Sequence, residues 1–277
     1  MKKDNLEYLK EQIKFAGFGD AMDVKLQEML EKGQPEFTLA HEHSFGRDKV
    51  EAQLHFNKSD QGNYFFNKYE LMLNKENGEA VKQVFHQNPP KEGLVRTADD
   101  PEGTKQWINT NISLKEAFNL LAGRAINKDL VNRQGEAYNS WVQLNFKETE
   151  ASGNFKKEYF SEKYGYDMEA ALKVHPIKEL GNDEDRNKLI ESLHKGNRQQ
   201  VTFTIGDKEE KRFLQANPKY KTIDVYDGNT RVRHSQGKEA KEGQEQGKSM
   251  KASNAGEDGE GGPKVQKPKR KKTQGIS

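Results

Sequence analysis

The chain ends three helix-like segments in the same way, with a leucine followed three positions later by a glycine. Each segment carries apolar residues at helical spacing before this ending. Glycine adopts the left-handed backbone conformation that often ends a helix, and a leucine three residues earlier can pack beneath the turn. We therefore expect helices that stop at these three sites, and the capping box Ser-Leu-Lys-Glu (113–116) predicts the start of the second one. The endings are Leu30-x-x-Gly33, Leu120-x-x-Gly123 and Leu193-x-x-Gly196.

The segments after the three endings are also alike, because each contains two strand-like stretches separated by another glycine. The first pair turns at Gly46, the second at Gly135 and the third, less clearly, at Gly206. The return strands of the first two pairs contain nearly the same phrase, QLHFNK (53–58) and QLNFKE (143–148). Their alternating apolar residues predict one buried and one solvent-exposed face for each hairpin. These residues are Ala52, Leu54 and Phe56 in the first return strand, and Val142, Leu144 and Phe146 in the second.

A strand pair alone is marginally stable, and an amphipathic helix laid across it supplies the missing cover. The sequence therefore predicts an α+β fold, in which repeated helix-plus-β-hairpin units form small antiparallel sheets covered by helices. Two further helices are expected, one from Asp4 to Gly17 and one from Asp167 to Pro176.

Three strands are expected outside the repeated units. Segments 64–73 and 81–85 extend the first hairpin into a meander, and segment 221–227 forms the last strand. The stretch 88–106 contains three prolines and is expected to be a long surface loop. The expected domains are residues 1–110 with the N-terminal helices and meander, residues 111–235 with two further helix-plus-hairpin units, and residues 236–277 as a tail.

The composition favours several thin layers over one large core, because only 32% of the residues are hydrophobic and 32% are charged. The absence of cysteine excludes disulfides and thiolate metal sites and is compatible with a reducing cytoplasm. The first residues, MKKDNLEYLKEQIKF, lack the apolar run of a secretory signal. No stretch approaches the roughly 18 apolar residues of a membrane helix. We expect a cytoplasmic protein without membrane contact.

The charge is distributed unevenly along the chain. Residues 236–277 carry ten basic and six acidic side chains, whereas residues 1–235 carry 36 basic and 38 acidic ones. The tail has no aromatic residue and is expected to be disordered, because it cannot bury enough apolar surface to offset its ordering entropy. Its last basic stretch is expected to contact phosphates of DNA or RNA without sequence preference. The residues concerned are Lys264, Lys267, Lys269, Arg270, Lys271 and Lys272.

Two arginines are expected to add positive charge at equivalent corners of two units. Arg124 comes directly after Gly123, and Arg198 comes two residues after Gly196. Both are candidate contacts for nucleic acid, and the alternative is that they are merely solvated. Stacking of bases on an aromatic surface is a further option, although we favour the interpretation that the same side chains fill the core. These aromatic residues are Tyr64, Phe65, Phe66 and Tyr69.

No residue pattern indicates catalysis, a cofactor or a metal site. No serine or histidine occurs in a recognisable nucleophile motif, and no carboxylate pair has a spacing typical of acid–base catalysis. His41 and His43 share one strand face, which metal sites often exploit. Phe37, Leu39 and Phe45 lie on that face too, so two half-buried sheet histidines are the favoured interpretation. We expect a non-enzymatic protein that binds no metal and no small-molecule cofactor.

Six stretches of the chain carry a resemblance to a family. They are YLKEQIKFAGFG, YFFNKYELML, LLAGRAINKDLVNRQGEAYNSWVQLNFKE, YGYDMEAALKVHPIKEL, SLHKGNRQQVTF and NPKYKTIDVYD. Together they resemble uncharacterised proteins of anaerobic gut bacteria of the Bacteroides type, grouped under domains of unknown function. The resemblance spans nearly all of residues 5–232. It implies an association with conjugative and other mobile elements, and it carries over no catalytic residues.

These observations lead to one main hypothesis and one alternative. The main hypothesis is a non-enzymatic accessory protein of a mobile genetic element, which contacts nucleic acid nonspecifically through the basic tail. The alternative is a protein–protein interaction scaffold that binds a protein of the mobile-element machinery through open sheet edges, with the tail serving only solubility. A positive potential continuous across Arg124, Arg198 and one sheet face would favour nucleic acid, and a large exposed apolar patch would favour a protein partner.

Overall fold

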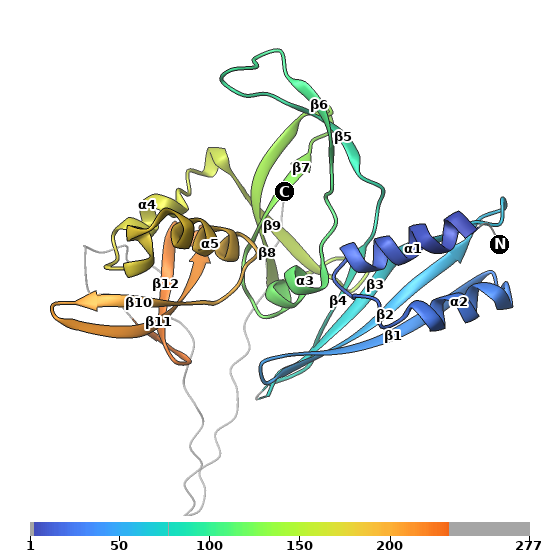
Figure 1. The fold of residues 1–277 in the computed structure, drawn as a ribbon, viewed down its shortest axis with the longest axis horizontal. Helices are drawn as coiled ribbons and strands as arrows, with labels where there is room; N and C mark the ends of the chain where they lie inside the picture. The colour runs from blue at the N-terminus through green and yellow to red at the C-terminus, as the bar shows by residue number, and fades with distance from the viewer. Residues whose placement is uncertain (1–2, 77, 233–277) are drawn as a thin grey trace, which may run out of the picture. The chain divides into compact units, whose positions relative to one another are not determined.

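The computed structural model describes residues 3–76 and 78–232 of the chain. This part contains five α-helices and thirteen strands, and the strands form four small antiparallel sheets (Figure 1). The expectation of an α+β fold with small antiparallel sheets and helices is confirmed. The expected tail, residues 236–277, lies outside the described residues. The helices are α1 (Lys3–Phe15), α2 (Asp23–Lys32), α3 (Leu114–Leu121), α4 (Met168–Lys173) and α5 (Asp183–His194).

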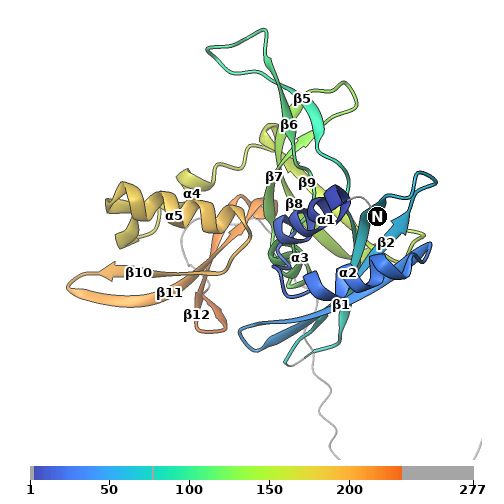
Figure 2. The same ribbon diagram turned by 45° about the vertical axis from the view of Figure 1, so that its right-hand side comes forward.

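The first sheet is a four-stranded meander that α1 and α2 cover on one face (Figures 1 and 2). This arrangement confirms the expected extension of the first hairpin. Ala52, Leu54 and Phe56 are buried as predicted, and they pack in one cluster with residues of both helices. The strands are β1 (Glu36–Phe45), β2 (Asp48–Lys58), β3 (Tyr64–Asn74) and β4 (Val81–His86).

The other sheets come later in the chain, and two expectations about them are wrong. The stretch 88–106 is not a long loop, because most of it forms a hairpin that is tied to the third sheet by Leu94 N donating to Gly135 O at 2.8 Å. Segment 221–227 is not the last strand, because residues 230–232 add another one to it. The strands are β5 (Lys91–Val95) and β6 (Thr104–Ile108); β7 (Ile126–Val131), β8 (Ala137–Thr149) and β9 (Phe155–Ser161); and β10 (Gln199–Ile205), β11 (Lys208–Asn217), β12 (Thr222–Asp227) and β13 (Thr230–Val232).

The described part of the chain packs around two clusters of buried apolar side chains. The first cluster joins α1, α2, α3 and the β1–β4 sheet to Val142 and Leu144 of β8. The second joins α4, α5 and the last sheet to Trp141 of the same strand. Residues Met1–His234 form one compact unit. The first cluster contains residues on both sides of position 110, so the expected boundary there does not separate two cores.

The three leucine–glycine endings all end helices as predicted. In each, the glycine N–H donates to the carbonyl oxygen of the leucine three residues earlier, at distances of 3.1, 2.9 and 2.9 Å in chain order. Each helix is followed by the expected hairpin, namely β1–β2, β7–β8 and β10–β11. The third hairpin, which the sequence marks least clearly, is paired along its whole length. The capping box predicted at Ser113 and Glu116 is present at the start of α3.

The similarity of the two return strands stops at their last apolar position. Phe56 is fully buried, whereas Phe146 is 41% exposed. The pairing of β8 with β9 is irregular between Asn145 and Thr149, and this irregularity ends the alternation that would have turned Phe146 inward. The prediction of a buried Phe146 is therefore wrong.

Gly196 occupies the most constrained of the three helix endings. Its φ is +77°, and an added Cβ would lie 2.7 Å from Ala125 O and 2.8 Å from Ile126 Cγ2. A methyl group cannot be placed there unless the backbone of the neighbouring strand moves. Gly206, in the β10–β11 turn, also has a positive φ of +61°, but no described atom lies within 4 Å of its added Cβ. A comparison of the same substitution at the two glycines therefore distinguishes the cost of a left-handed backbone from the cost of a steric clash.

We predict that Gly196→Ala destabilises the protein more than Gly206→Ala does. Both changes place a Cβ in the left-handed region, which costs about 1–2 kcal/mol. Only the first change also forces a clash, which adds about 1–3 kcal/mol. Urea unfolding of both variants gives the difference in the free energy of unfolding. Equal losses of the free energy of unfolding in the two variants would show that the contact between Gly196 and Ala125 is not tight.

Candidate anion-binding pocket

The two arginines singled out in the sequence line the same pocket. Arg124 follows the end of α3, and Arg198 lies between α5 and β10. The pocket has a volume of about 710 Å³, and Arg47 and Lys115 also line it. The sequence marked Arg124 and Arg198 as equivalent corners of two units, and folding brings these corners together. Four basic side chains from separate parts of the chain therefore meet here.

Arg124 is a partly buried guanidinium held by an amide and an aromatic ring. Its Nη1 donates to Asn119 Oδ1 at 2.6 Å, and its Cζ lies 5.0 Å from the centre of the Phe118 ring. Burial, followed by the nearby charge of Arg198, lowers the pKa of Arg124 to about 10. The side chain still carries its charge at pH 7 despite these two effects. Because its charged form is disfavoured by its surroundings, an added anion would gain from binding there.

Arg198 is stacked on an aromatic ring and fixed by the turn between β12 and β13. Its Cζ lies 3.9 Å from the centre of the Tyr226 ring, a geometry that favours a cation. Nη2 donates to Gly228 O at 2.5 Å, and Nη1 donates to Asn229 Oδ1 at 3.3 Å. Its Nε is buried and has no hydrogen-bond partner among the described residues. Burial lowers the pKa of Arg198 as well.

Lys115 is the third cation and the least restrained. Its Nζ lies 4.3 Å from the centre of the Phe45 ring and 5.0 Å from that of Phe118. The ammonium makes no hydrogen bond or ion pair within the described part of the chain. Burial, followed by repulsion from Arg124, lowers the pKa of Lys115. The aromatic rings thus hold a charge that nearby basic groups repel.

The carboxylates of the pocket form no ion pair with these three cations, although the charge of Asp48 opposes the lowering of the Arg124 pKa. Glu76 forms an ion pair with Arg47, in which Oε1 lies 3.4 Å from Nη1. Asp48 accepts a hydrogen bond from the backbone N–H of Glu76 at 3.3 Å. Within residues 3–76 and 78–232, no carboxylate lies within ion-pair distance of the other three cations. Four basic and two acidic side chains line the pocket, which gives a formal charge of +2. Its unpaired cations are Lys115, Arg124 and Arg198.

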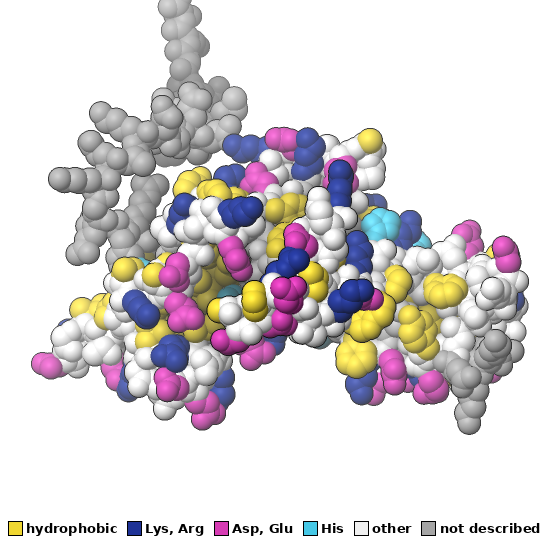
Figure 3. All heavy atoms as spheres, turned by 90° about the horizontal axis from the view of Figure 1, so that it is seen from above, with side chains coloured by type: hydrophobic (Ala, Val, Ile, Leu, Met, Phe, Trp, Pro, Cys, Tyr) yellow, Lys and Arg dark blue, Asp and Glu magenta, His cyan; other side chains and the backbone are white. Residues whose placement is uncertain are grey.

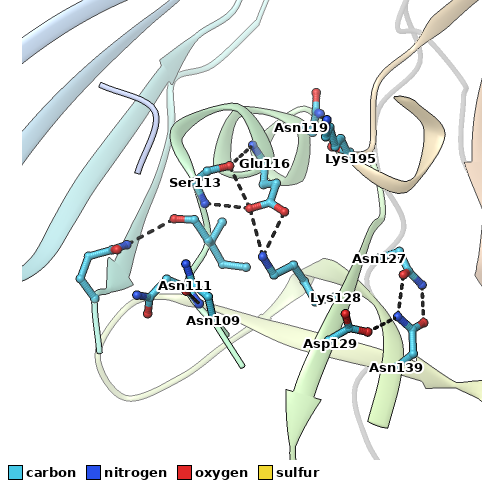
Figure 4. Close-up of polar contacts among 12 residues, drawn as sticks. Asn109, Asn111, Ser113, Glu116, Asn119, Asn127, Lys128, Asp129, Asn139 and Lys195 are labelled. Carbon is cyan, nitrogen blue, oxygen red and sulfur yellow. Dashed lines mark hydrogen bonds and ion pairs between the residues drawn. The ribbon is translucent and has the colours of Figure 1, made fainter. Parts of the chain in front are cut away.

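Asn119 connects the parts of the chain that carry the two arginines. It is fully buried, and its Oδ1 accepts the hydrogen bond from Arg124. Its Nδ2 donates to Lys195 O at 2.6 Å and to Asn197 Oδ1 at 3.1 Å, so α3 is bonded to the turn that leads to Arg198 (Figure 4). Asn119 was not among the residues predicted from the sequence. An asparagine among the apolar residues of LKEAFNLL was the signal that could have identified it.

The aromatic stacking surface considered from the sequence is not formed. Tyr64, Phe66 and Tyr69 are buried in the first cluster, as the favoured interpretation predicted, and only Phe65 is exposed. His41 is half-buried as expected, but His43 is exposed, so the expectation of two half-buried histidines is wrong for His43. The centres of the two rings lie 6.2 Å apart. No group of three or more potential metal ligands occurs among the described residues. No helix in the same residues is long and apolar enough to span a membrane.

A second, smaller pocket lies on the other side of α3. It has a volume of about 340 Å³ and contains the ion pair between Glu116 and Lys128, in which both side chains are largely shielded from solvent. Figure 4 shows Glu116 between Ser113 and Lys128. The charges of this pair compensate each other, so the second pocket lacks the group of unpaired cations found in the first one. The sequence analysis found only the capping box here, not the ion pair.

On the face drawn in Figure 3, basic and acidic side chains are interspersed. This face therefore offers no extended basic surface. The six basic residues of the tail, Lys264 to Lys272, lie outside the described residues.

Comparison of the chain with protein-family models, with curated proteins and with solved structures finds no match. The chemistry of the pocket therefore has to be argued from its own residues. Three unpaired cations, fixed on aromatic faces and by hydrogen bonds, form a site suited to an anion.

We predict that Lys115→Met leaves the free energy of unfolding unchanged within about 0.5 kcal/mol or raises it. Methionine keeps the apolar stem of the side chain, and the change removes a charge that burial and Arg124 disfavour. Residues that form a binding site are often unfavourable for stability in this way. Urea unfolding is the measurement, with Lys25→Met, an exposed change on α2, as the control for the lost charge. A clear loss of stability in Lys115→Met alone would show that the ammonium stabilises the fold.

Proposed function

We propose that the protein is a non-enzymatic accessory protein of a mobile genetic element that contacts nucleic acid through its phosphate groups. The observation that carries this proposal is the pocket in which Lys115, Arg124 and Arg198 converge without carboxylate partners among the described residues. Lysine and arginine are the side chains that neutralise nucleic-acid phosphates. Guanidinium groups also match the geometry of phosphate oxygens.

The pocket and the basic tail have different roles in this proposal. The pocket cations are held by rings and hydrogen bonds, so they fix one phosphate at a defined place on the folded part. The tail supplies six further cations that neutralise phosphates at any sequence. Neither element reads base edges, so the contact is nonspecific with respect to sequence.

The mobile-element context rests on the sequence resemblance over residues 5–232. The same three helix endings and following hairpins support a further part of the proposal, namely that the folded chain contains three versions of one helix-plus-hairpin unit. In that case Arg124 and Arg198 are corresponding positions of two units, and the pocket forms where these units meet.

A protein-interaction scaffold is the second candidate, and two observations favour it. Trp107 on β6 is 73% exposed, and large aromatic side chains are enriched in the centres of protein interfaces. β1 is the outer strand of the first sheet in the described part of the chain, so its edge could pair with an added strand. We place this candidate second because single exposed hydrophobic residues are common on protein surfaces.

The salt dependence of DNA binding tests the proposal. Fluorescence anisotropy of labelled single- and double-stranded DNA and RNA is measured with the full chain at several salt concentrations. If the six tail cations each contact a duplex phosphate and the pocket holds one more, the slope of log K against log salt is about −6. Replacing the six tail cations by glutamine should reduce its magnitude by about 5, and Lys115→Met should reduce it by at most about 1.

Each result has a distinct meaning. If the tail variant still binds, and if adding Lys115→Met weakens this binding, the result supports a contact made by the pocket. A tail variant that no longer binds assigns the contact to the tail alone. Absence of binding by the full chain near physiological salt would overturn the proposal and favour the scaffold.

A further inference from the structure

We infer that the pocket binds a terminal phosphate of a nucleic-acid strand in preference to an internal phosphodiester. This inference rests on the proposed function and specifies which phosphate the pocket takes. Three features of the pocket support it: the hydrogen-bond donors that remain free, the formal charge, and the aromatic faces that its cations already cover.

The free hydrogen-bond donors lie on three different cations. Lys115 Nζ donates to no group among the described residues. Nη1 and Nη2 of Arg198 each use one N–H, for Asn229 and Gly228, so each keeps a second N–H. Arg124 uses Nη1 for Asn119, which leaves its Nε and Nη2 without a partner in the same part of the chain. A terminal phosphate presents three oxygens that are not bonded to a second sugar, whereas an internal phosphodiester presents two. Three separate cations therefore match the terminal group better.

The charge of the pocket points the same way. The formal lining charge of +2 comes from four basic and two acidic residues. A phosphate monoester carries a charge of about −1.5 to −2 at pH 7, because its second pKa is about 6. An internal phosphodiester carries one negative charge per nucleotide. The terminal group therefore compensates the repulsion between Arg124 and its basic neighbours more fully than an internal group does.

The aromatic rings of the pocket are already in use by its cations. Lys115 lies over Phe45 and Phe118, and Arg198 Cζ lies 5.6 Å from the centre of the Phe213 ring. A base cannot stack on these faces without displacing a cation. The pocket therefore recognises the phosphate itself and not the base beside it. We expect no preference for the terminal nucleotide.

The test uses one single strand of about 20 nucleotides in three forms, with a 5′-phosphate, with a 3′-phosphate, or with hydroxyls at both ends. Binding to the full chain is measured by anisotropy at about 0.3 M salt, where the contribution of the tail is weakened. We expect the phosphorylated strands to bind about tenfold more tightly, the equivalent of one charge-assisted hydrogen bond. Lys115→Met should lose most of this preference, and Lys25→Met should keep it.

Competition experiments identify the source of the phosphate. Inorganic phosphate and a nucleoside monophosphate are titrated against the bound 5′-phosphorylated strand. Weak competition by both supports an end of a nucleic-acid strand. If the free mononucleotide competes as well as the phosphorylated strand, the ligand is a nucleotide and the inference is overturned. A phosphorylated peptide that competes equally well would overturn it in favour of a protein partner.

Failure of the inference can be distinguished from failure of the proposed function. Equal affinity for the phosphorylated and hydroxyl-ended strands overturns the inference and leaves nucleic-acid binding in place. Equal preference for the phosphorylated strands in Lys115→Met and in the unaltered chain overturns the assignment to this pocket. If none of the three strands binds at any salt concentration, both the inference and the proposed function fail.

Discussion

The hydrogen bonds of the Asn119 side chain determine where the unpaired charges of the pocket lie. One fully buried amide accepts from Arg124 and donates to the backbone of Lys195 and to Asn197. Such a group is costly to bury unless its partners are present, so the three contacts support one another. They hold α3 against the turn after α5, where Gly196 allows the close approach. The pocket between Arg124 and Arg198 is a consequence of this contact.

Features that depend on neighbouring residues could be predicted from the sequence. The three leucine–glycine endings and the capping box at Ser113 involve residues a few positions apart, and these are confirmed. Features that depend on distant pairing could not be predicted. The β5–β6 hairpin is fixed by Gly135, about forty positions away along the chain, and Phe146 is exposed because β8 and β9 pair irregularly beside it.

The same distinction between local and long-range features applies to the candidate site. The sequence identified Arg124 and Arg198 from their places after glycines, which is local information. Their meeting in one pocket depends on contacts between α3 and the α5–β10 turn, and no periodicity encodes such contacts. Lys115 was not identified from the sequence, because a lysine after a capping serine is common on a helix surface. Its significance comes from Phe45 at the end of β1, whose ring it covers.

β8 has a consequence for how the folded part comes apart. Trp141 belongs to the second cluster, while its neighbour Val142 belongs to the first. Adjacent residues of a strand point to opposite faces, so this one strand forms a wall of both cores. A slip by one residue would exchange the two side chains and damage both clusters together. The clusters are therefore coupled through a shared strand, and heat or denaturant should disrupt them in a single cooperative transition.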